Sequence, residues 1–266
     1  MHALKAVNQL KICFMSKEII IIPDIHGRDF WKEAMEKYPD ADTIFLGDYL
    51  DPYGYERISF RKAMENFREI IEHVKSHPNC HLLIGNHDLH YLIGQNWSRK
   101  DWDWADEVEA LITDNIELFD FIAIRELNGR SYVFSHAPVF KEWSRYTDMP
   151  EDIGTIQTAL RAMLKNAADN KQELNRLFGR ATRKRGGSDV CGSPVWADLD
   201  EAEKNTFVDG GDYFIFGHTQ LDEPVITDRY ACLDSHQAFR LDEDGKIEAI
   251  TEKKTPDLPK SSGGWF

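Results

Sequence analysis

The chain has 266 residues, of which 42% are hydrophobic and 12% aromatic. This composition excludes a disordered protein, and the length is sufficient for one large domain with a full core. The formal net charge of −14 argues against a nucleic-acid partner, because affinity for phosphate backbones depends on clustered Lys and Arg.

The sequence also argues against a membrane or secreted protein. It contains no apolar stretch of the roughly 18 to 20 residues that a membrane helix needs, and its N-terminus lacks the layout of a signal peptide. The four cysteines, Cys13, Cys80, Cys191 and Cys232, show no Cys-x-x-Cys spacing. We therefore expect reduced thiols, no membrane partner and a cytoplasmic location.

Strands and helices are expected to alternate in the first part of the chain. Short apolar runs predict strands at 18–22, 43–46 and 81–84. Amphipathic spacing predicts helices at 28–38 and 58–75. This alternation favours right-handed βαβ units and a largely parallel sheet.

The pattern changes in the second part of the chain. We expect a helix within 96–117, strands at 119–124 and 131–134 joined by an Asn-Gly turn, and polar helical sequence from 141 to 179. Several short strands follow, at 213–216, 225–227, 230–233, 238–241 and 246–250.

These elements divide the chain into three parts. We expect residues 1–15 to form an N-terminal extension, 16–252 one domain, and 253–266 a flexible tail. The helical stretch at about 140–190 reads as an insertion that caps the sheet edges. No composition shift typical of a linker separates it from the rest of the domain.

Five short motifs follow apolar runs and contain residues that bind metal ions through oxygen or imidazole nitrogen. They are Asp24-Ile25-His26-Gly27, Gly47-Asp48-Tyr49-Leu50-Asp51, Gly85-Asn86-His87-Asp88, Ser135-His136-Ala137 and Gly217-His218-Thr219. Ligands of open α/β sheets collect at the carboxyl ends of the strands, so we expect these side chains to meet there. The predicted metal ligands are Asp24, His26, Asp48, Asn86, His136 and His218.

The residue types in these motifs are those of a two-metal hydrolytic site. Asp24 and His26 lie two positions apart after a strand, on the same side of the backbone, so both can hold one cation. Asp48 has two carboxylate oxygens with which to bridge two cations. Two divalent ions about 3.5–4 Å apart can share a hydroxide that attacks a phosphate. Mixed carboxylate, amide and imidazole ligands suit manganese, iron or zinc, and we expect two manganese ions.

His87 is expected to serve a different purpose. It follows a predicted ligand but is expected to face away from the metals, where it can protonate the leaving group. An imidazolium needs an anionic neighbour to remain protonated near neutral pH, and Asp51 is the expected neighbour. His87 and Asp51 are therefore the predicted catalytic pair.

The ordered motif set resembles the calcineurin-like metallophosphoesterases, and within them the phosphoprotein phosphatase branch, over about residues 18–240. The segment 85–92 is similar to the corresponding segment of the symmetrical diadenosine tetraphosphatases, and 193–198 to the branch's leucine-leucine-tryptophan-serine-aspartate-proline motif. The resemblance implies an α/β fold, a four-layer αββα sandwich of two mixed β-sheets with a helical insertion. It assigns one metal to Asp24, His26 and Asp48, the other to Asp48, Asn86, His136 and His218, and proton transfer to His87 with Asp51.

Two positions depart from the pattern of the larger family or of this branch. Gln220 stands where many metallophosphoesterases have a second histidine, and the branch also lacks this histidine. Pro52 stands where the branch has an arginine that grips phosphate. We expect Arg183 or Arg185, from the basic segment 180–188, to supply the guanidinium instead. The alternative is that these arginines form a solvated charge run.

The sequence therefore predicts a binuclear metal-dependent phosphoesterase. We expect it to hydrolyse phosphate monoesters of a phosphorylated protein or a small molecule, most like a serine/threonine protein phosphatase. The first alternative is a symmetrical diadenosine tetraphosphate hydrolase, which the segment 85–90 favours. The second is a non-catalytic scaffold, but such a protein would be expected to have lost Asn86 or His87, and both are present.

Other polar and aromatic residues near the motifs are expected to support the site or the core. Asp88 is expected to be an outer partner or helix cap rather than a direct ligand. His90 either supports the site or lies on the surface, and Asp234 and His236 are weaker candidates for a place near it. Three tryptophans are expected to anchor a helix on the core, the alternative being that they line a substrate face. They are Trp97, Trp102 and Trp104.

Overall fold

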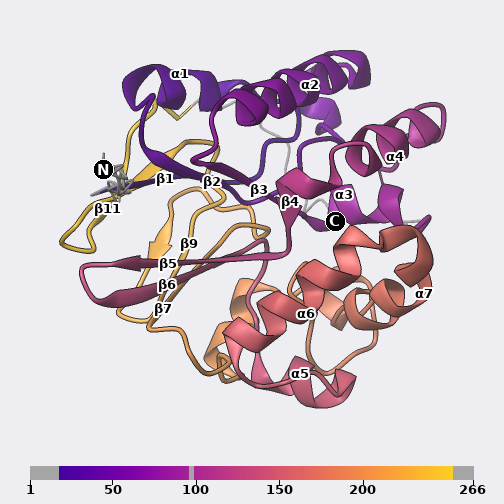
Figure 1. Cartoon of the computed structure of the whole chain (residues 1–266), viewed down its shortest axis with the longest axis vertical. Coiled ribbons are helices and arrows are strands. Elements are labelled where there is room, and N and C mark those ends of the chain that lie inside the picture. The colour runs from indigo at the N-terminus through magenta and orange to yellow at the C-terminus, as the bar shows by residue number, and fades with distance from the viewer. Residues whose placement is uncertain (1–17, 96–98, 254–266) are drawn as a thin grey trace, which may run out of the picture.

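Two mixed β-sheets form the centre of the fold in the computed structural model, which describes residues 18–95 and 99–253 (Figure 1). The first sheet contains β1 (Ile19–Ile22), β2 (Asp42–Phe45), β3 (Cys80–Leu83), β4 (Phe119–Asp120), β10 (Phe239–Leu241) and β11 (Ile247–Ala249). Its order is β11-β10-β1-β2-β3-β4, in which β1 to β4 are parallel and β10 and β11 are antiparallel to their neighbours. The parallel arrangement predicted for the first strands is confirmed.

The second sheet is built from the later part of the chain. It contains β5 (Ile122–Leu127), β6 (Arg130–Ser135), β7 (Tyr213–Phe216), β8 (Val225–Ile226) and β9 (Tyr230–Cys232). Its order is β5-β6-β7-β9-β8, with parallel pairs between β6, β7 and β9 and antiparallel pairs at both edges. The predicted architecture of two mixed sheets flanked by helices is therefore confirmed.

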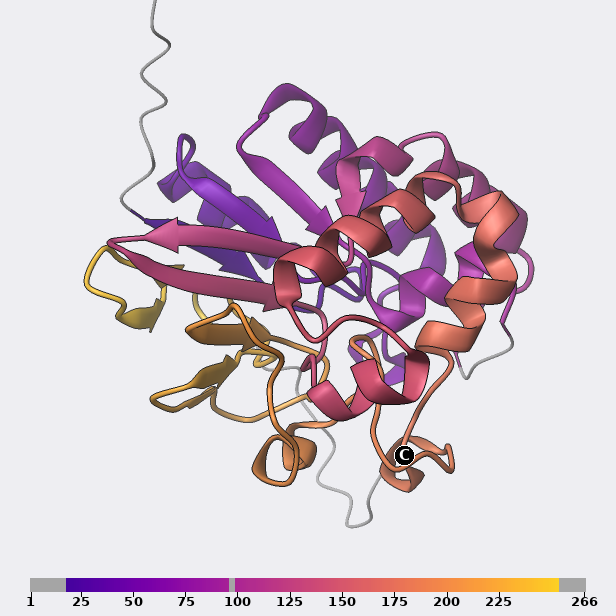
Figure 2. The same ribbon diagram turned by 60° about the horizontal axis from the view of Figure 1, so that its bottom comes forward.

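Helices pack against the outer faces of the sheets (Figures 1 and 2). Those that follow strands of the first sheet are α1 (Phe30–Lys37), α2 (Phe60–Ser76), α3 (Asn86–Leu92) and α4 (Ala105–Thr113). Those between β6 and β7 are α5 (Lys141–Thr147), α6 (Ile153–Lys165) and α7 (Ala167–Phe178). Short 3-10 turns lie at Gly54–Glu56, Ile116–Leu118, Arg183–Arg185 and Leu199–Glu203.

The four isoleucines of β1 explain why this strand lies in the middle of the molecule. Successive side chains of a strand point to opposite faces of its sheet. Ile20 and Ile22 accordingly belong to the core shared with α1 and α2. Ile19 and Ile21 belong to the core between the two sheets. Because both faces are covered, the strand reads as an uninterrupted apolar run.

The single strand expected at 119–124 is wrong. β4 pairs with β3 in the first sheet, whereas β5 pairs with β6 in the second. The chain passes from one sheet to the other at Phe121, whose buried ring stacks on Phe178 with the centroids 4.2 Å apart. A continuous apolar run cannot reveal this crossing, because both halves have the pattern of a buried strand.

The region predicted to be a helical insertion contains three helices. α5 ends at Thr147, its C-cap residue Asp148 has a left-handed φ of 55°, and Pro150 follows before α6 begins. The buried side chains of α6, among them Ile156 and Leu160, belong to the same core as those of α2. The three helices lie together on one side of the molecule (Figure 2).

Two of the expectations about cysteines and membranes can be compared with the described residues. Cys80, Cys191 and Cys232 are buried and form no disulfide, whereas Cys13 lies outside the described residues. In the ranges that the structure describes, no helix combines the length and apolar character needed to cross a bilayer.

Candidate metal centre

The six predicted metal ligands come from loops at the ends of five strands. Asp24 and His26 follow β1, Asp48 follows β2 and Asn86 follows β3. The histidines of the second sheet follow β6 and β7. They are His136 and His218. All six side chains are at least nine-tenths buried, which is costly for charged and polar groups unless they are paired.

The carboxylate of Asp48 joins these residues into two groups. Its Oδ2 atom lies 3.5 Å from Nε2 of His26 and 3.5 Å from Nε2 of His136. One group is completed by Asp24 and the other by His218, and within each group the potential ligand atoms lie within 4.8 Å of one another. The structure thus brings the predicted ligands together around a shared carboxylate.

Hydrogen bonds to the backbone orient two of the imidazoles. Nδ1 of His26 lies 2.7 Å from the carbonyl oxygen of Leu50, and Nδ1 of His136 lies 2.9 Å from that of Leu46. Because a carbonyl only accepts hydrogen bonds, each Nδ1 carries the hydrogen and each Nε2 presents a lone pair to the centre. This is the usual arrangement of histidines that bind metals.

The donor set fits divalent cations. Nε2 of His136 faces Oδ1 of Asn86 at 2.9 Å, Nδ1 of His218 at 3.2 Å and the Asp48 carboxylate. Because the lone pair of this nitrogen faces other electron-rich atoms, a cation between them would remove their mutual repulsion. Burial lowers the pKa of His26 and of His218, so both rings are neutral, as metal binding requires.

Burial and the charge of a neighbouring carboxylate make two carboxylates near the centre costly to ionise. Burial, and secondly the charge of Asp24, raises the pKa of Asp48 well above its ordinary value. The same two causes raise the pKa of Asp234, whose buried Oδ1 has no hydrogen-bond partner among the residues that the structure describes. Asp234, left as a weaker candidate by the sequence, therefore belongs to the surroundings of the centre.

Several residues of the centre have left-handed backbone conformations. The φ angles are 42° at His26, 52° at Asp48, 55° at Asp51 and 63° at His218. Such conformations cost on the order of 1–3 kcal/mol each for residues other than glycine and persist where the surroundings impose them. Here the carbonyl of Asp48 accepts hydrogen bonds from the amides of Ile25 and His26, at 3.1 and 2.7 Å. Strain of this kind concentrates at functional sites.

Two glycines allow the carboxylates to lie against the backbone. A Cβ atom at Gly85 would come within 2.1 Å of Oδ1 of Asp48, and one at Gly217 within 2.1 Å of Oδ1 of Asp24. Any side chain at either position would displace a predicted ligand. The glycines of these motifs are thus part of the site.

The predicted catalytic pair lies beside the centre. Nδ1 of His87 lies 2.7 Å from Oδ2 of Asp51. The hydroxyl of Tyr91 donates to Oδ1 of the same carboxylate at 2.5 Å, and Nε2 of His90 lies 2.9 Å from Oδ2. His90 is therefore a buried neighbour of Asp51 and is not on the surface.

The charges of this pair differ from the expectation. Burial lowers the pKa of His87 to about 4, although the hydrogen bond that the ring donates to Asp51 acts in the opposite direction. Burial alone would raise the pKa of Asp51, but hydrogen bonds from His87 and His90 outweigh it and lower the pKa. In the protein alone His87 is thus a neutral ring beside an ionised carboxylate.

The sequence model of the calcineurin-like phosphoesterases matches residues 17–222, more than half of the chain. The chain belongs to this family. It is therefore a metal-dependent phosphoester hydrolase. No curated protein sequence matches the chain.

Solved structures show the same fold as this phosphoesterase. The cold-active protein tyrosine phosphatase aligns with a TM-score of 0.52 and 16% identity, over 90% of this chain and 80% of that one. A mutant of a cold-active protein tyrosine phosphatase aligns with a TM-score of 0.51 and 14% identity, over 89% and 81%. At these identities the likeness shows the fold alone.

The sequence analysis missed Arg99 of the phosphoesterase. Its Nη1 donates to the carbonyl oxygen of Asp51 at 2.8 Å, and its Nη2 lies 2.8 Å from Nε2 of His87. Its guanidinium carbon lies 3.9 Å from the centroid of the Tyr53 ring. Arg99 is 48 residues from Asp51 and directly precedes the Trp- and Asp-rich residues 101–104, so no motif spacing indicated this contact.

The two arginines proposed from the sequence lie in different environments. Nη2 of Arg185 lies 2.7 Å from Oδ2 of Asp198 and donates to Oγ1 of Thr219 at 3.0 Å, beside His218. Arg183 is exposed. The phosphate-binding role of either arginine stays a prediction.

Asp88 holds two loops of the phosphoesterase in position. Its Oδ2 accepts hydrogen bonds from the amides of Asp48 and Gly85, at 2.7 and 2.8 Å, and its Oδ1 from the amide of Tyr49 at 3.0 Å. Asp88 therefore contacts the backbone of the ligand loops, in agreement with the outer position expected from the sequence.

We predict that Asp88→Ala leaves these three buried amides unpaired and displaces Asp48. Each unpaired amide costs about 1–3 kcal/mol, so the free energy of unfolding in urea falls by at least about 3 kcal/mol. Metal affinity, measured by equilibrium dialysis, falls about 10- to 100-fold. Asp40→Ala, at an exposed position, is the control and should change neither quantity. Unchanged affinity in Asp88→Ala would show that Asp88 does not position the ligands.

Proposed function

We propose that this phosphoesterase hydrolyses phosphate monoesters at a centre of two divalent metal ions, most like a serine/threonine protein phosphatase. The observation that carries the proposal is the carboxylate of Asp48, which lies equally close to a ring nitrogen of His26 and of His136. Each half of the centre then has its own set of ligands. The proposed sets are Asp24, His26 and Asp48 for one ion, and Asp48, Asn86, His136 and His218 for the other.

Manganese is the proposed metal, with iron or zinc able to use the same ligands. The donors are carboxylate and amide oxygens and imidazole nitrogens, a mixture that suits all three metals. When bound, the ions supply positive charge for the phosphoryl oxygens and lower the pKa of the attacking water. In the hydrolysis, the oxygen of water bonds to phosphorus and the bond from phosphorus to the leaving oxygen breaks.

His87 is the proposed proton donor to the leaving oxygen. Its Nδ1 donates to Asp51, and its Nε2 faces Nη2 of Arg99 at 2.8 Å. We propose that Nε2 donates to the leaving oxygen once the bound phosphate has drawn the Arg99 guanidinium toward itself. A dianionic phosphate next to the ring favours its protonated form. The products are then an alcohol or phenol and inorganic phosphate.

Arg99 and Arg185 are the proposed phosphate-binding arginines. Arg99 lies beside His87, and Arg185 lies beside His218 on the other side of the centre. The flat contact with Tyr53 and the hydrogen bond to Asp51 hold the Arg99 guanidinium in place. We propose that Arg99 occupies the role that the absent arginine at position 52 has in the phosphoprotein phosphatase branch, with Arg183 left to solvent.

A symmetrical diadenosine tetraphosphatase is the second candidate, favoured by the segment 85–90. A scaffold without activity is less well supported. In a scaffold, neither the strained backbone at Asp48 nor the buried contact between His87 and Asp51 would be needed.

We predict that a chelator abolishes hydrolysis of para-nitrophenyl phosphate and that added manganese restores it. Asp48→Asn should lower kcat/KM by about 1,000-fold, because the metal-supplied stabilisation of several kcal/mol is lost. Parallel assays with a phosphoserine peptide and diadenosine tetraphosphate distinguish the first two candidates. A protein with two bound metals that turns over none of the three substrates would support the scaffold.

We predict that His87→Asn lowers kcat on a phosphoserine peptide by about 100- to 10,000-fold, the usual contribution of a general acid. The loss on para-nitrophenyl phosphate should be smaller, because nitrophenolate leaves without a proton. His81→Asn, a half-buried histidine on β3, is the control. Full turnover of the peptide by His87→Asn with unchanged metal content would exclude the general-acid role.

We predict that Arg99→Ala lowers kcat/KM about 10- to 100-fold, mainly through KM, because charge-assisted hydrogen bonds to phosphate are lost. Arg99→Lys should restore part of the loss. Arg145→Ala, at an exposed arginine of α5, is the control. If Arg183→Ala proves more damaging than Arg99→Ala, the phosphate-binding arginine comes from the basic segment.

A further inference from the structure

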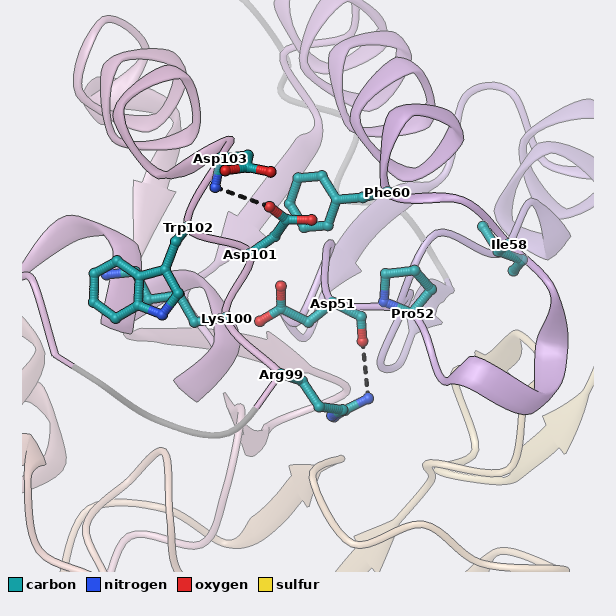
Figure 3. Close-up of a pocket in the computed structure, with 9 residues that line it drawn as sticks. All are labelled: Asp51, Pro52, Ile58, Phe60, Arg99, Lys100, Asp101, Trp102 and Asp103. Carbon is teal, nitrogen blue, oxygen red and sulfur yellow. Dashed lines mark hydrogen bonds between the residues drawn. The ribbon is translucent and has the colours of Figure 1, made fainter.

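A pocket of about 530 Å³ opens beside the proposed catalytic pair (Figure 3). Asp51 and Arg99 line the pocket and also contact His87. The pocket therefore lies next to two residues that contact His87, the proposed proton donor to the leaving oxygen.

One wall of the pocket is the indole of Trp102, which is 59% exposed. The expectation that Trp102 anchors a helix on the core is wrong, whereas Trp104 does pack there. Trp97 lies outside the described residues. The Trp102 ring is nevertheless held, because Nζ of Lys100 lies 4.6 Å from its centroid.

Lys100 itself has a fixed position. Its ammonium donates to the carbonyl oxygens of His90 and Gln95, at 3.0 and 3.2 Å. The exposed indole therefore rests on an immobilised cation. A large aromatic side chain held at the surface in this way offers a flat face for stacking at little cost in entropy.

The rest of the pocket is also suited to an apolar ring. Phe60, Ile58 and Pro52 contribute ring and aliphatic surface. Pro52 and Trp102 lie on opposite sides of Asp51 in Figure 3. Pro52 stands where the phosphoprotein phosphatase branch has a charged arginine, so this chain has apolar surface at that point.

The volume and charge of the pocket restrict the group that it can hold. Its volume lies within the range of about 300–1,000 Å³ typical of sites for small organic molecules, and a seryl side chain would fill little of it. Three carboxylates line the pocket against two cations; the carboxylates are those of Asp51, Asp101 and Asp103, and the cations are Arg99 and Lys100. This excess of negative charge disfavours a leaving group that carries further phosphates.

We infer that this pocket receives the leaving group of the substrate and that the group is uncharged and contains an aromatic ring. A tyrosyl side chain and a nucleoside both have this chemistry. The inference rests on the proposed phosphomonoesterase function, and it favours tyrosyl or nucleoside phosphates over the phosphoserine and phosphothreonine substrates of a serine/threonine phosphatase.

Matched substrate pairs test the inference. Adenosine 5′-monophosphate and ribose 5-phosphate have the same kind of leaving oxygen and differ in the ring. A phosphotyrosine and a phosphoserine peptide of otherwise identical sequence form the second pair. With manganese-loaded full-length protein, Trp102→Ala should lower kcat/KM about 10-fold for the ring-containing member of at least one pair, mainly by raising KM. The change for the other member should be less than twofold.

The controls separate stacking from other effects of the substitution. Trp102→Leu keeps apolar surface but removes the ring and should behave like Trp102→Ala. Tyr146→Ala removes another exposed aromatic ring, on α5, and should leave kcat/KM unchanged for both substrates of each pair. The substrate pair whose kcat/KM values change unequally in Trp102→Ala shows whether the ring belongs to a nucleoside or to a tyrosyl group.

Two outcomes would overturn the inference in different ways. If the wild-type protein is active but Trp102→Ala affects both members of each pair equally, the pocket does not bind the ring and the proposed function stands. If the wild-type protein hydrolyses no member of either pair, the proposed function fails and the inference fails with it.

Discussion

The buried carboxylate of Asp48 is the constraint on which the site depends. Its side chain lies between imidazoles from both sheets, and its backbone amide is held by Asp88. Burial and the nearby Asp24 raise its pKa, so the loops around it converge on a carboxylate that is costly to ionise in the protein alone. Metal binding and the stability of these loops are therefore linked, because a cation that binds only the folded centre stabilises it.

A second carboxylate, that of Asp51, organises the side of the site that faces the pocket. His87, His90 and Tyr91 all lie within hydrogen-bonding distance of it. Its backbone carbonyl also accepts from Arg99. One residue thus places the proposed proton donor, the proposed phosphate-binding arginine and the wall of the pocket next to each other. Its backbone has the left-handed conformation that is concentrated at functional sites.

The secondary structure was predictable where the spacing of the apolar residues is typical of only one kind of element. The amphipathic spacing of α2 and the all-apolar run of β1 each allow one interpretation. The run at 119–124 allows two, since a strand and a crossing between sheets have the same local pattern. Trp102 shows a related limit, because an aromatic residue in an acidic segment has the same sequence pattern whether its ring is buried or exposed.

By itself, the sequence determined the family and the set of predicted ligands. The ligands could be predicted because each lies shortly after an apolar strand, and the carboxyl ends of parallel strands lie at the same edge of a sheet. Only the tertiary structure decided that Arg99 lies against His87 and that Trp102 borders a pocket. The physical reason is the range of the contacts. Arg99 and Asp51 are 48 residues apart and meet through a loop that has no repeating pattern, so their contact exists only once the chain has folded.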